Sequence, residues 1–473
     1  MTAGEGRARR ARRRDRQVYL ASHPVIFALL AATRGRAVTR LGGTLLISGT
    51  EAFRETLTRL PLDRTARGTT GGLARAVIED GVPFEDGVLF EDGVLFDQDG
   101  SAHREMRRSL AADLGAAGVE RLRPVWRAVL ARHLAALGAG GEVDMVQASA
   151  EIAGATVCAL LGLDADPVAV ARAVSVAAGA AAREHLPGIR LPGIRRPGTQ
   201  RAGIQRAGIR RPGAHRPESH RPGTQRPETH RPETQPAGTQ WPWIRRPGAQ
   251  RPGENRTLAE ATDHLIQLLG ARRPDATGTP DATGTPDATG MPDATGMPDV
   301  AGMAVMLAIA AVSTTMAGIP RAVAWCADCG MWPDADSDER REILAGELLR
   351  VTAPTPLLPR VAAADGVAGG RRVRKGDRLI LVARHAAGAH RAGPDCGQPA
   401  PPQVAQLVFG AGSHACPGAA LARAQLCDTL QMLAPYRPVV VRARADRHSV
   451  LPGWRTLVIR ADPRSGQQGD SCG

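Results

Sequence analysis

The sequence predicts a mainly α-helical protein with small β-sheets, folded as one domain that low-complexity repeats interrupt. Apolar residues recur at helical spacing in several long stretches, among them residues 103–114, 124–137 and 144–163. Strand-like sequence is confined to short pieces at residues 44–48 and 378–382. A length of 473 residues would by itself indicate several domains, but repeats account for much of it.

The chain begins with a strongly basic stretch. Residues 1–17 hold seven arginines against two acidic residues, and we predict a disordered tail there. The apolar run that follows gives this region the outline of a signal peptide. His23 and Pro24 interrupt that run, so a basic tail before an amphipathic first helix is the preferred interpretation. The N-terminal part of the domain is predicted over residues 18–185.

Three tandem repeats interrupt the domain, and we predict that the two later blocks are disordered insertions. EDGV hexapeptides run over residues 79–96, RPGTQ-like pentapeptides fill residues 186–256, and PDATG units lie in a linker over residues 274–302. The later blocks are rich in Pro and Gly and poor in large apolar residues, so burial cannot repay the entropy of ordering. Residues 257–273, between them, are predicted to form a helix of the domain.

Most of the net charge of +14 lies outside the predicted globular part. The pentapeptide block contributes +11 and residues 1–17 contribute +5, which leaves the remainder nearly neutral. The high isoelectric point is therefore no argument for a nucleic-acid enzyme. Nucleic-acid binding through the regularly spaced arginines stays open as a minor alternative, in which deletion of that block would abolish binding.

The C-terminal part of the domain is predicted over residues 303–462, before a disordered tail at residues 463–473. It opens with an apolar stretch, residues 302–318, whose length approaches that of a membrane span. Ser313, Thr314 and many small residues in this stretch are more typical of a helix buried in a large protein. We therefore predict no membrane span.

Cysteine usage favours a reducing compartment. Seven cysteines, an odd number spread over a long chain, do not form a disulfide framework, which predicts a cytoplasmic protein. Cys326 and Cys329 form a CxxC motif that is compatible with a redox pair or half a zinc site. Since no second such motif lies nearby, two ordinary helix cysteines are the preferred interpretation.

Cys416 stands in a glycine-rich loop directly before a predicted helix. A helix N-terminus offers free N–H groups and positive potential, which favour a thiolate over a thiol. Gly410, Gly412 and Gly418 allow the backbone to turn tightly and to approach a flat, bulky group. The pattern indicates a cysteine that ligates a metal through sulfur.

This stretch resembles the haem-binding loop of the cytochrome P-450 family, F-G-x-G-x-[HR]-x-C-x-G. Every fixed position of that pattern is matched, by Phe409, Gly410, Gly412, His414, Cys416 and Gly418. The resemblance implies a cytochrome P-450-like fold and a haem b cofactor. It also implies that the Cys416 thiolate ligates the iron and that Phe409, Gly410, His414 and Gly418 contact the haem.

Two further pairs extend the resemblance. Glu347 and Arg350 match the ExxR pair of the family, which implies a structural role behind the haem, although such pairs are common on exposed helices. His103 and Arg107 share one helix face. Together with Arg360 they match residues that bind the haem propionates; for His103 and Arg107 an ordinary surface pair is the alternative.

On the distal side the sequence departs from the family pattern A-G-x-[DE]-T. The best register places Ser313 at the acid position and Thr314 at the alcohol position. A second register, which starts at Ala317, places Pro320 at the acid position. Neither register supplies a carboxylate for a proton relay. We also expect Pro320, together with Gly318, to kink or end this helix.

A second departure lies between Asp395 and Val408. The family places an arginine there that completes the ExxR network, and this sequence has none. We therefore expect the pair of Glu347 and Arg350 to be incompletely satisfied.

The resemblance implies a monooxygenase that inserts one oxygen atom from O2 into a small organic substrate. The chain lacks flavin, nicotinamide and iron–sulfur motifs, so a ferredoxin and its reductase are the expected electron donors. The missing acid leaves two alternatives open: a peroxide-driven, coupling or rearrangement enzyme, and a non-catalytic haem-binding sensor or structural partner. The abundance of Ala, Arg and Gly is associated with GC-rich genomes and with specialised metabolism.

Overall fold

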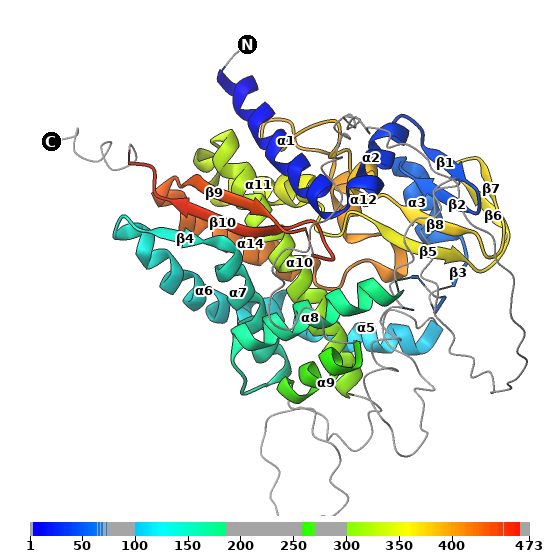
Figure 1. Ribbon diagram of the computed structural model, residues 1–473, viewed down its shortest axis with the longest axis horizontal. Coiled ribbons are helices and arrows are strands. Elements are labelled where there is room, and N and C mark those ends of the chain that lie inside the picture. The colour runs from blue at the N-terminus through cyan, green and yellow to red at the C-terminus, as the bar shows by residue number, and fades with distance from the viewer. Residues whose placement is uncertain are drawn as a thin grey trace, which may run out of the picture. The chain divides into compact units, whose positions relative to one another are not determined.

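The computed structural model describes residues 3–63, 65–66, 68–69, 72, 100–185, 258–269, 300–447 and 449–463 (Figure 1). The chain divides into two units, Met1–Ile189 with Asn255–Gly473, and Arg190–Glu254. The second unit lies outside the described residues, as do the EDGV and PDATG repeats and most of the predicted C-terminal tail. The architecture below is that of the first unit.

Helices make up most of the described chain, which confirms the prediction of a mainly α-helical protein. The described α-helices are α1 (Ala3–Ser22), α2 (Pro24–Thr33), α3 (Thr50–Arg59), α5 (Gly100–Leu114), α6 (Ala116–Gly138), α7 (Met145–Leu161), α8 (Pro167–His185), α9 (Leu258–Leu268), α10 (Val300–Cys329), α11 (Asp338–Thr352), α12 (Ala383–Ala386), α13 (Pro402–Ala405) and α14 (Ala419–Leu433). The 3₁₀ turns are η1 (Trp332–Ala335), η2 (Gln406–Phe409), η3 (Gly412–His414) and η4 (Ala434–Tyr436).

Three small sheets complete the described fold. Their strands are β1 (Val38–Leu41), β2 (Thr44–Ile47), β3 (Leu62–Asp63), β4 (Glu142–Asp144), β5 (Leu358–Ala362), β6 (Gly366–Ala368), β7 (Arg371–Val373), β8 (Arg378–Leu381), β9 (Val439–Ala445) and β10 (Trp454–Arg460). The sheet orders are β1-β2-β8-β5-β3, β4-β10-β9 and β6-β7. The two strands expected from sequence, β2 and β8, pair in parallel, with Leu45 opposite Leu379.

Helix α10 runs through the core and packs against α1, α7, α8 and α11 (Figure 1). In the described part of the chain it is the one helix apolar and long enough to cross a membrane, but 56% of that apolar window is buried within the protein. The helix begins at Val300, inside the predicted linker, so the boundary set at residue 303 is wrong. Val300, Ala304 and Leu307 recur at helical spacing, so the apolar pattern of the helix already starts before residue 303.

Of the two expectations for Pro320 and Gly318, a kink or the end of this helix, the second is wrong. α10 continues through Pro320 to Cys329. Proline removes one backbone hydrogen bond, which is costly in an isolated helix. Here the following turns are fixed by tertiary packing, since Ala322, Val323 and Cys326 are completely buried.

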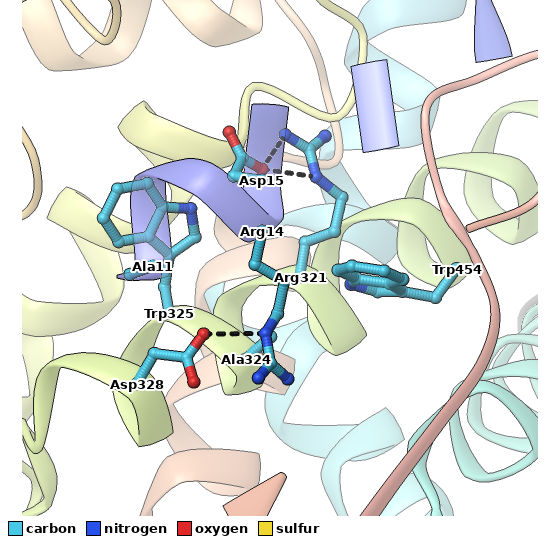
Figure 2. Close-up of a pocket in the computed structure, with 8 residues that line it drawn as sticks. All are labelled: Ala11, Arg14, Asp15, Arg321, Ala324, Trp325, Asp328 and Trp454. Atoms are coloured by element: carbon cyan, nitrogen blue, oxygen red, sulfur yellow. Dashed lines mark hydrogen bonds and ion pairs between the residues drawn. The ribbon is translucent and has the colours of Figure 1, made fainter. Parts of the chain in front are cut away.

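The N-terminal segment corrects a further prediction, because residues 3–17 belong to α1 and are not a disordered tail. One face of α1 enters the core, with Ala11 and Val18 buried. Asp15 lies on the same face and accepts hydrogen bonds from Nε and Nη2 of Arg321 at 3.1 and 2.7 Å (Figure 2). The high arginine content hid this buried face, and the buried ion pair anchors α1 to α10.

Candidate functional site

The cysteine loop joins η2 to α14 by two turns that require glycine. Gly410 and Gly412 have φ angles of 81° and 74°, in the region that side chains other than glycine rarely adopt. The Cys416 N–H donates to the Phe409 carbonyl at 2.8 Å, which closes the loop on itself. Gly418 then caps α14, so a helix begins directly after the loop, as the sequence predicts.

A substitution at Gly412 tests this geometry. A Cβ at this position would lie 3.2 Å from the Leu57 carbonyl oxygen and 3.3 Å from Cγ2 of Thr58, in a backbone conformation already unfavourable for alanine. We expect Gly412→Ala to destabilise the protein by about 1–3 kcal/mol in chemical unfolding. Gly346→Ala, in helix α11 with no atom within 4 Å of its added Cβ, is the control, and should be neutral or stabilising. Equal stability of the two variants would contradict the strained turn.

The Cys416 thiol is accessible to solvent although protein surrounds it closely. Desolvation raises its pKa, while the Gly418 backbone N–H and the charge of Arg107 act in the opposite direction. The net direction of the pKa shift is upward, because desolvation outweighs the helix-start N–H and the charge of Arg107. Coordination to a metal ion would deprotonate the thiol outright.

Helix α5 brings two of the predicted residues to this loop. The His103 ring, which is buried, stacks on the His414 ring with centroids 3.9 Å apart and an interplanar angle of 22°. One turn further along α5, Arg107 Nη1 donates to the carbonyl of Ala415, the residue before the cysteine. The ordinary surface-pair alternative for His103 and Arg107 does not agree with these contacts.

The pair of Glu347 and Arg350 lies in helix α11 and is almost fully buried, with side chains 2% and 3% exposed. Arg350 Nε and Nη2 donate to the two carboxylate oxygens of Glu347 at 2.8 and 2.5 Å. The guanidinium therefore holds both oxygens of the carboxylate in a bidentate arrangement.

Backbone groups take the place of the arginine that the sequence lacks. The N–H groups of Asp395 and Ala400 donate to Glu347 at 3.2 and 3.0 Å, and the Gly393 carbonyl accepts from Arg350 Nη2 at 2.7 Å. The expectation of an incompletely satisfied pair is thus wrong. Sequence reasoning missed these partners because backbone groups have no sequence signature.

Two histidines, His385 and His390, lie close in sequence to Ala387, whose carbonyl also accepts from Arg350. The His385 and His390 rings lie 4.4 Å apart, and the Ala387 carbonyl between them in sequence accepts from Arg350 at 3.4 Å. Burial lowers the pKa of His385 to about 3 and that of His390 to about 4, with Arg34, Arg384 and Arg391 adding to both shifts. Both rings are therefore neutral in the folded protein near neutral pH.

These lowered pKa values predict a loss of stability in mild acid. The unfolded chain takes up protons below about pH 6.5, whereas the folded state does so only near pH 4 and 3. His385 alone should lower the free energy of unfolding by about 2 kcal/mol between pH 7.5 and 5. Urea unfolding of wild type and His385→Gln across this range measures the difference. A variant with the same pH dependence as wild type would refute this assignment.

Arg360 lies in β5, half-buried and opposite Leu379 of β8. Its Nη1 donates to the Pro359 carbonyl at 2.7 Å. Its predicted role at a propionate comes from the resemblance.

On α10, Ser313 and Thr314 are both half-buried. The Thr314 hydroxyl donates to the Ala310 carbonyl one turn earlier at 2.7 Å. Without a carboxylate at position 313, Ser313 and Thr314 supply hydroxyl groups that can pass on a proton, but neither side chain is an acid near neutral pH.

The CxxC cysteines lie in the last turns of α10. Cys326 is completely buried, and burial raises the pKa of Cys329 to about 11. Within the described residues no group of three or more His, Cys, Asp or Glu side chains could hold a metal ion. The raised pKa disfavours redox use, because the thiolate is the reactive form.

The residues at the cysteine loop fit a haem. An accessible sulfur on a glycine-rich backbone suits an axial iron ligand, and the adjoining His103, His414 and Arg107 suit the carboxylates of a porphyrin. The Cys416 residue is exposed, which agrees with a position that another group can cover.

Solved cytochrome P450 structures share the fold of this chain. A complex of P450BioI with an acyl carrier protein has 13% identity and a TM-score of 0.58, covering 94% of this chain and 100% of that one. The mycinamicin VIII hydroxylase MycCI from Micromonospora griseorubida has 18% identity and a TM-score of 0.57, with coverages of 91% and 95%. CYP105P2 from Streptomyces peucetius has 21% identity and a TM-score of 0.55, with the same coverages.

No family model matches the chain. No curated protein matches it either. The resemblance to cytochrome P450 is therefore confirmed at the level of the fold, and the activity has to be argued from the residues of the site.

Proposed function

We propose that this protein is a haem-thiolate monooxygenase that inserts one oxygen atom from O2 into a small organic substrate. The observation that carries the proposal is the accessible Cys416 thiol, set before α14 in a cytochrome P450 fold and flanked by groups from α5. When bound through a thiolate, a haem supplies oxygen activation with electron donation that favours O–O cleavage.

Each residue of the site has a proposed part in holding the haem. Cys416 Sγ would ligate the haem iron, and Gly410 and Gly418 would allow the loop to pass close to the haem, beside Phe409. Three side chains would hold the propionates in addition to His414: His103 and Arg107 of α5 and Arg360 of β5. Behind the loop, the bidentate pair in α11 fixes residues 393–400 and thereby the approach to η2.

The hydroxyl groups of α10 would determine how protons reach the reaction site. In the proposed reaction the Thr314 hydroxyl turns from the Ala310 carbonyl toward an ordered water, and the Ser313 hydroxyl extends the chain. Neither hydroxyl is acidic near neutral pH, so protons must enter from solvent or from a substrate group. We therefore expect oxygen activation to be slower than in a site that has a carboxylic acid at this position.

The absence of a carboxylate at Ser313 favours a second candidate, a peroxide-driven haem-thiolate enzyme, since hydrogen peroxide brings its own protons. A ferredoxin and a ferredoxin reductase are the proposed donors for the first candidate, in the cytoplasm. MycCI was solved with mycinamicin VIII, and we propose a specialised-metabolism compound of comparable kind as the substrate class here.

Isotope labelling separates the two candidates. The haem-loaded protein is incubated with a panel of macrolide compounds, first with ¹⁸O2, NADPH, ferredoxin and reductase, then with H2¹⁸O2 alone. Product mass spectra that contain one ¹⁸O atom only in the first incubation support the monooxygenase. A labelled product that forms only in the incubation with H2¹⁸O2 supports the second candidate. The absence of product in both incubations counts against both candidates.

A further inference from the structure

Helix α1 presents an array of arginines to solvent. Of its seven arginines, Arg14 pairs with Asp328, on which the charge of Arg10 also acts. Arg9, Arg10, Arg13 and Arg16 are exposed, and Arg9, Arg13 and Arg16 form no ion pair with any described residue. Cations three and four residues apart on one helix repel each other. Anchoring by the opposite, buried face keeps these charges together, and an anionic partner would relieve the repulsion.

A groove of about 210 Å³ runs between α1 and strand β9. Its walls are Arg14 and Gln17 of α1 and the consecutive β9 residues 440–443, with Trp454 of β10 below. Arg10 and Arg13 precede Arg14 and Gln17 at helical spacing, so all four positions share the face of α1 that borders the groove. One cation, Arg14, lines the groove on its helical side, and Arg10 and Arg13 lie at neighbouring positions of the same helix face.

The other wall is the open edge of a sheet. β9 pairs only with β10 in the order β4-β10-β9, and no backbone hydrogen bond joins its outer edge to any other described element. Unpaired N–H and C=O groups on an edge strand are a template for another strand. Val441 is 39% exposed there, and Arg442 and Arg444 are exposed beside it. These arginines disfavour self-pairing and admit an acidic strand.

We propose that this groove binds an extended acidic segment of a partner protein, which adds to the sheet as a strand beside β9. Alternate carboxylates of the segment would meet Arg442 on one side and Arg10 and Arg13 on the other. A polypeptide is favoured over a nucleic acid because the edge offers both donors and acceptors, whereas a phosphate backbone offers acceptors only. This surface lies outside the machinery of the proposed oxidation.

Fluorescence anisotropy of the full-length protein tests the proposal with a labelled ten-residue peptide of alternating Glu and Thr. We expect saturable binding that weakens with salt. The triple variant Arg10→Gln/Arg13→Gln/Arg442→Gln should raise the Kd at least tenfold. The matched variant Arg371→Gln/Arg374→Gln/Arg378→Gln removes three exposed arginines elsewhere and should leave the Kd within twofold.

A second measurement uses only the wild-type protein. The same peptide, N-methylated at every second residue, keeps its charge and cannot pair as a strand, so its Kd should be at least tenfold higher. Equal affinity for the methylated peptide would overturn strand addition. A single-stranded oligonucleotide of equal charge could instead bind more tightly than the peptide and lose that binding in the triple variant of Arg10, Arg13 and Arg442. This result would reassign the surface to nucleic acid.

Discussion

Replacing Arg350 by methionine is expected to lower the free energy of unfolding by about 3–5 kcal/mol. The substitution would leave the Glu347 carboxylate 2% exposed, with only the N–H groups of Asp395 and Ala400 to compensate its charge. It would also leave the Gly393 carbonyl without the guanidinium. Urea unfolding near neutral pH measures this loss, and reduced haem retention should accompany it.

The chain contains a matched control for this variant. Glu51 and Arg54 form a pair of the same spacing in α3, 2.8 Å apart, but the Glu51 side chain is 81% exposed. Arg54→Met should cost about 1 kcal/mol or less. A loss for Arg350→Met no larger than that for Arg54→Met would contradict the structural role of the buried pair.

Asp15→Asn should have an effect of similar size, about 3–5 kcal/mol, because it leaves a buried guanidinium without its carboxylate. The side chains of Asp15 and Arg321 are 3% and 1% exposed. The amide oxygen of the new side chain could still accept from Arg321, but only neutral groups would then surround the guanidinium charge, among them the Pro452 carbonyl at 3.4 Å and the face of the Tyr19 ring. Because the pair anchors α1, its loss should let this helix unfold locally. Trypsin should then cleave the peptide bonds that follow its arginines more readily.

The control for α1 is Asp336→Asn, which breaks the half-exposed pair with Arg437. This variant should unfold close to wild type, and its N-terminal segment should resist trypsin as wild type does. If Asp15→Asn is cleaved near its N-terminus no faster than Asp336→Asn, the anchoring role of Asp15 is wrong.

The cysteine loop could be predicted from sequence because its constraints are local. Gly410 and Gly412 are needed for positive φ, and the helix after Gly418 follows from its own residues. The central strands could be predicted because each is a short apolar run. Local signals of this kind do not depend on the rest of the chain.

The parts that sequence reasoning missed depend on tertiary packing. Residues 393–400 complete the ExxR network through backbone groups, which any residue carries. The anchoring face of α1 did have a signal, since Ala11, Asp15, Val18 and Ser22 recur at helical spacing and are all buried. The prediction of a disordered tail considered only the total charge of residues 1–17, and this periodicity was overlooked.

The measurement that tests the central claim most directly is the carbon monoxide spectrum of the reduced, haem-loaded protein. The account predicts a red-shifted, thiolate-type Soret band that is lost in Cys416→Ala and kept in Cys427→Ala, which removes a half-buried thiol of α14. A band that persists unchanged in Cys416→Ala would contradict the assignment of Cys416 as the haem ligand.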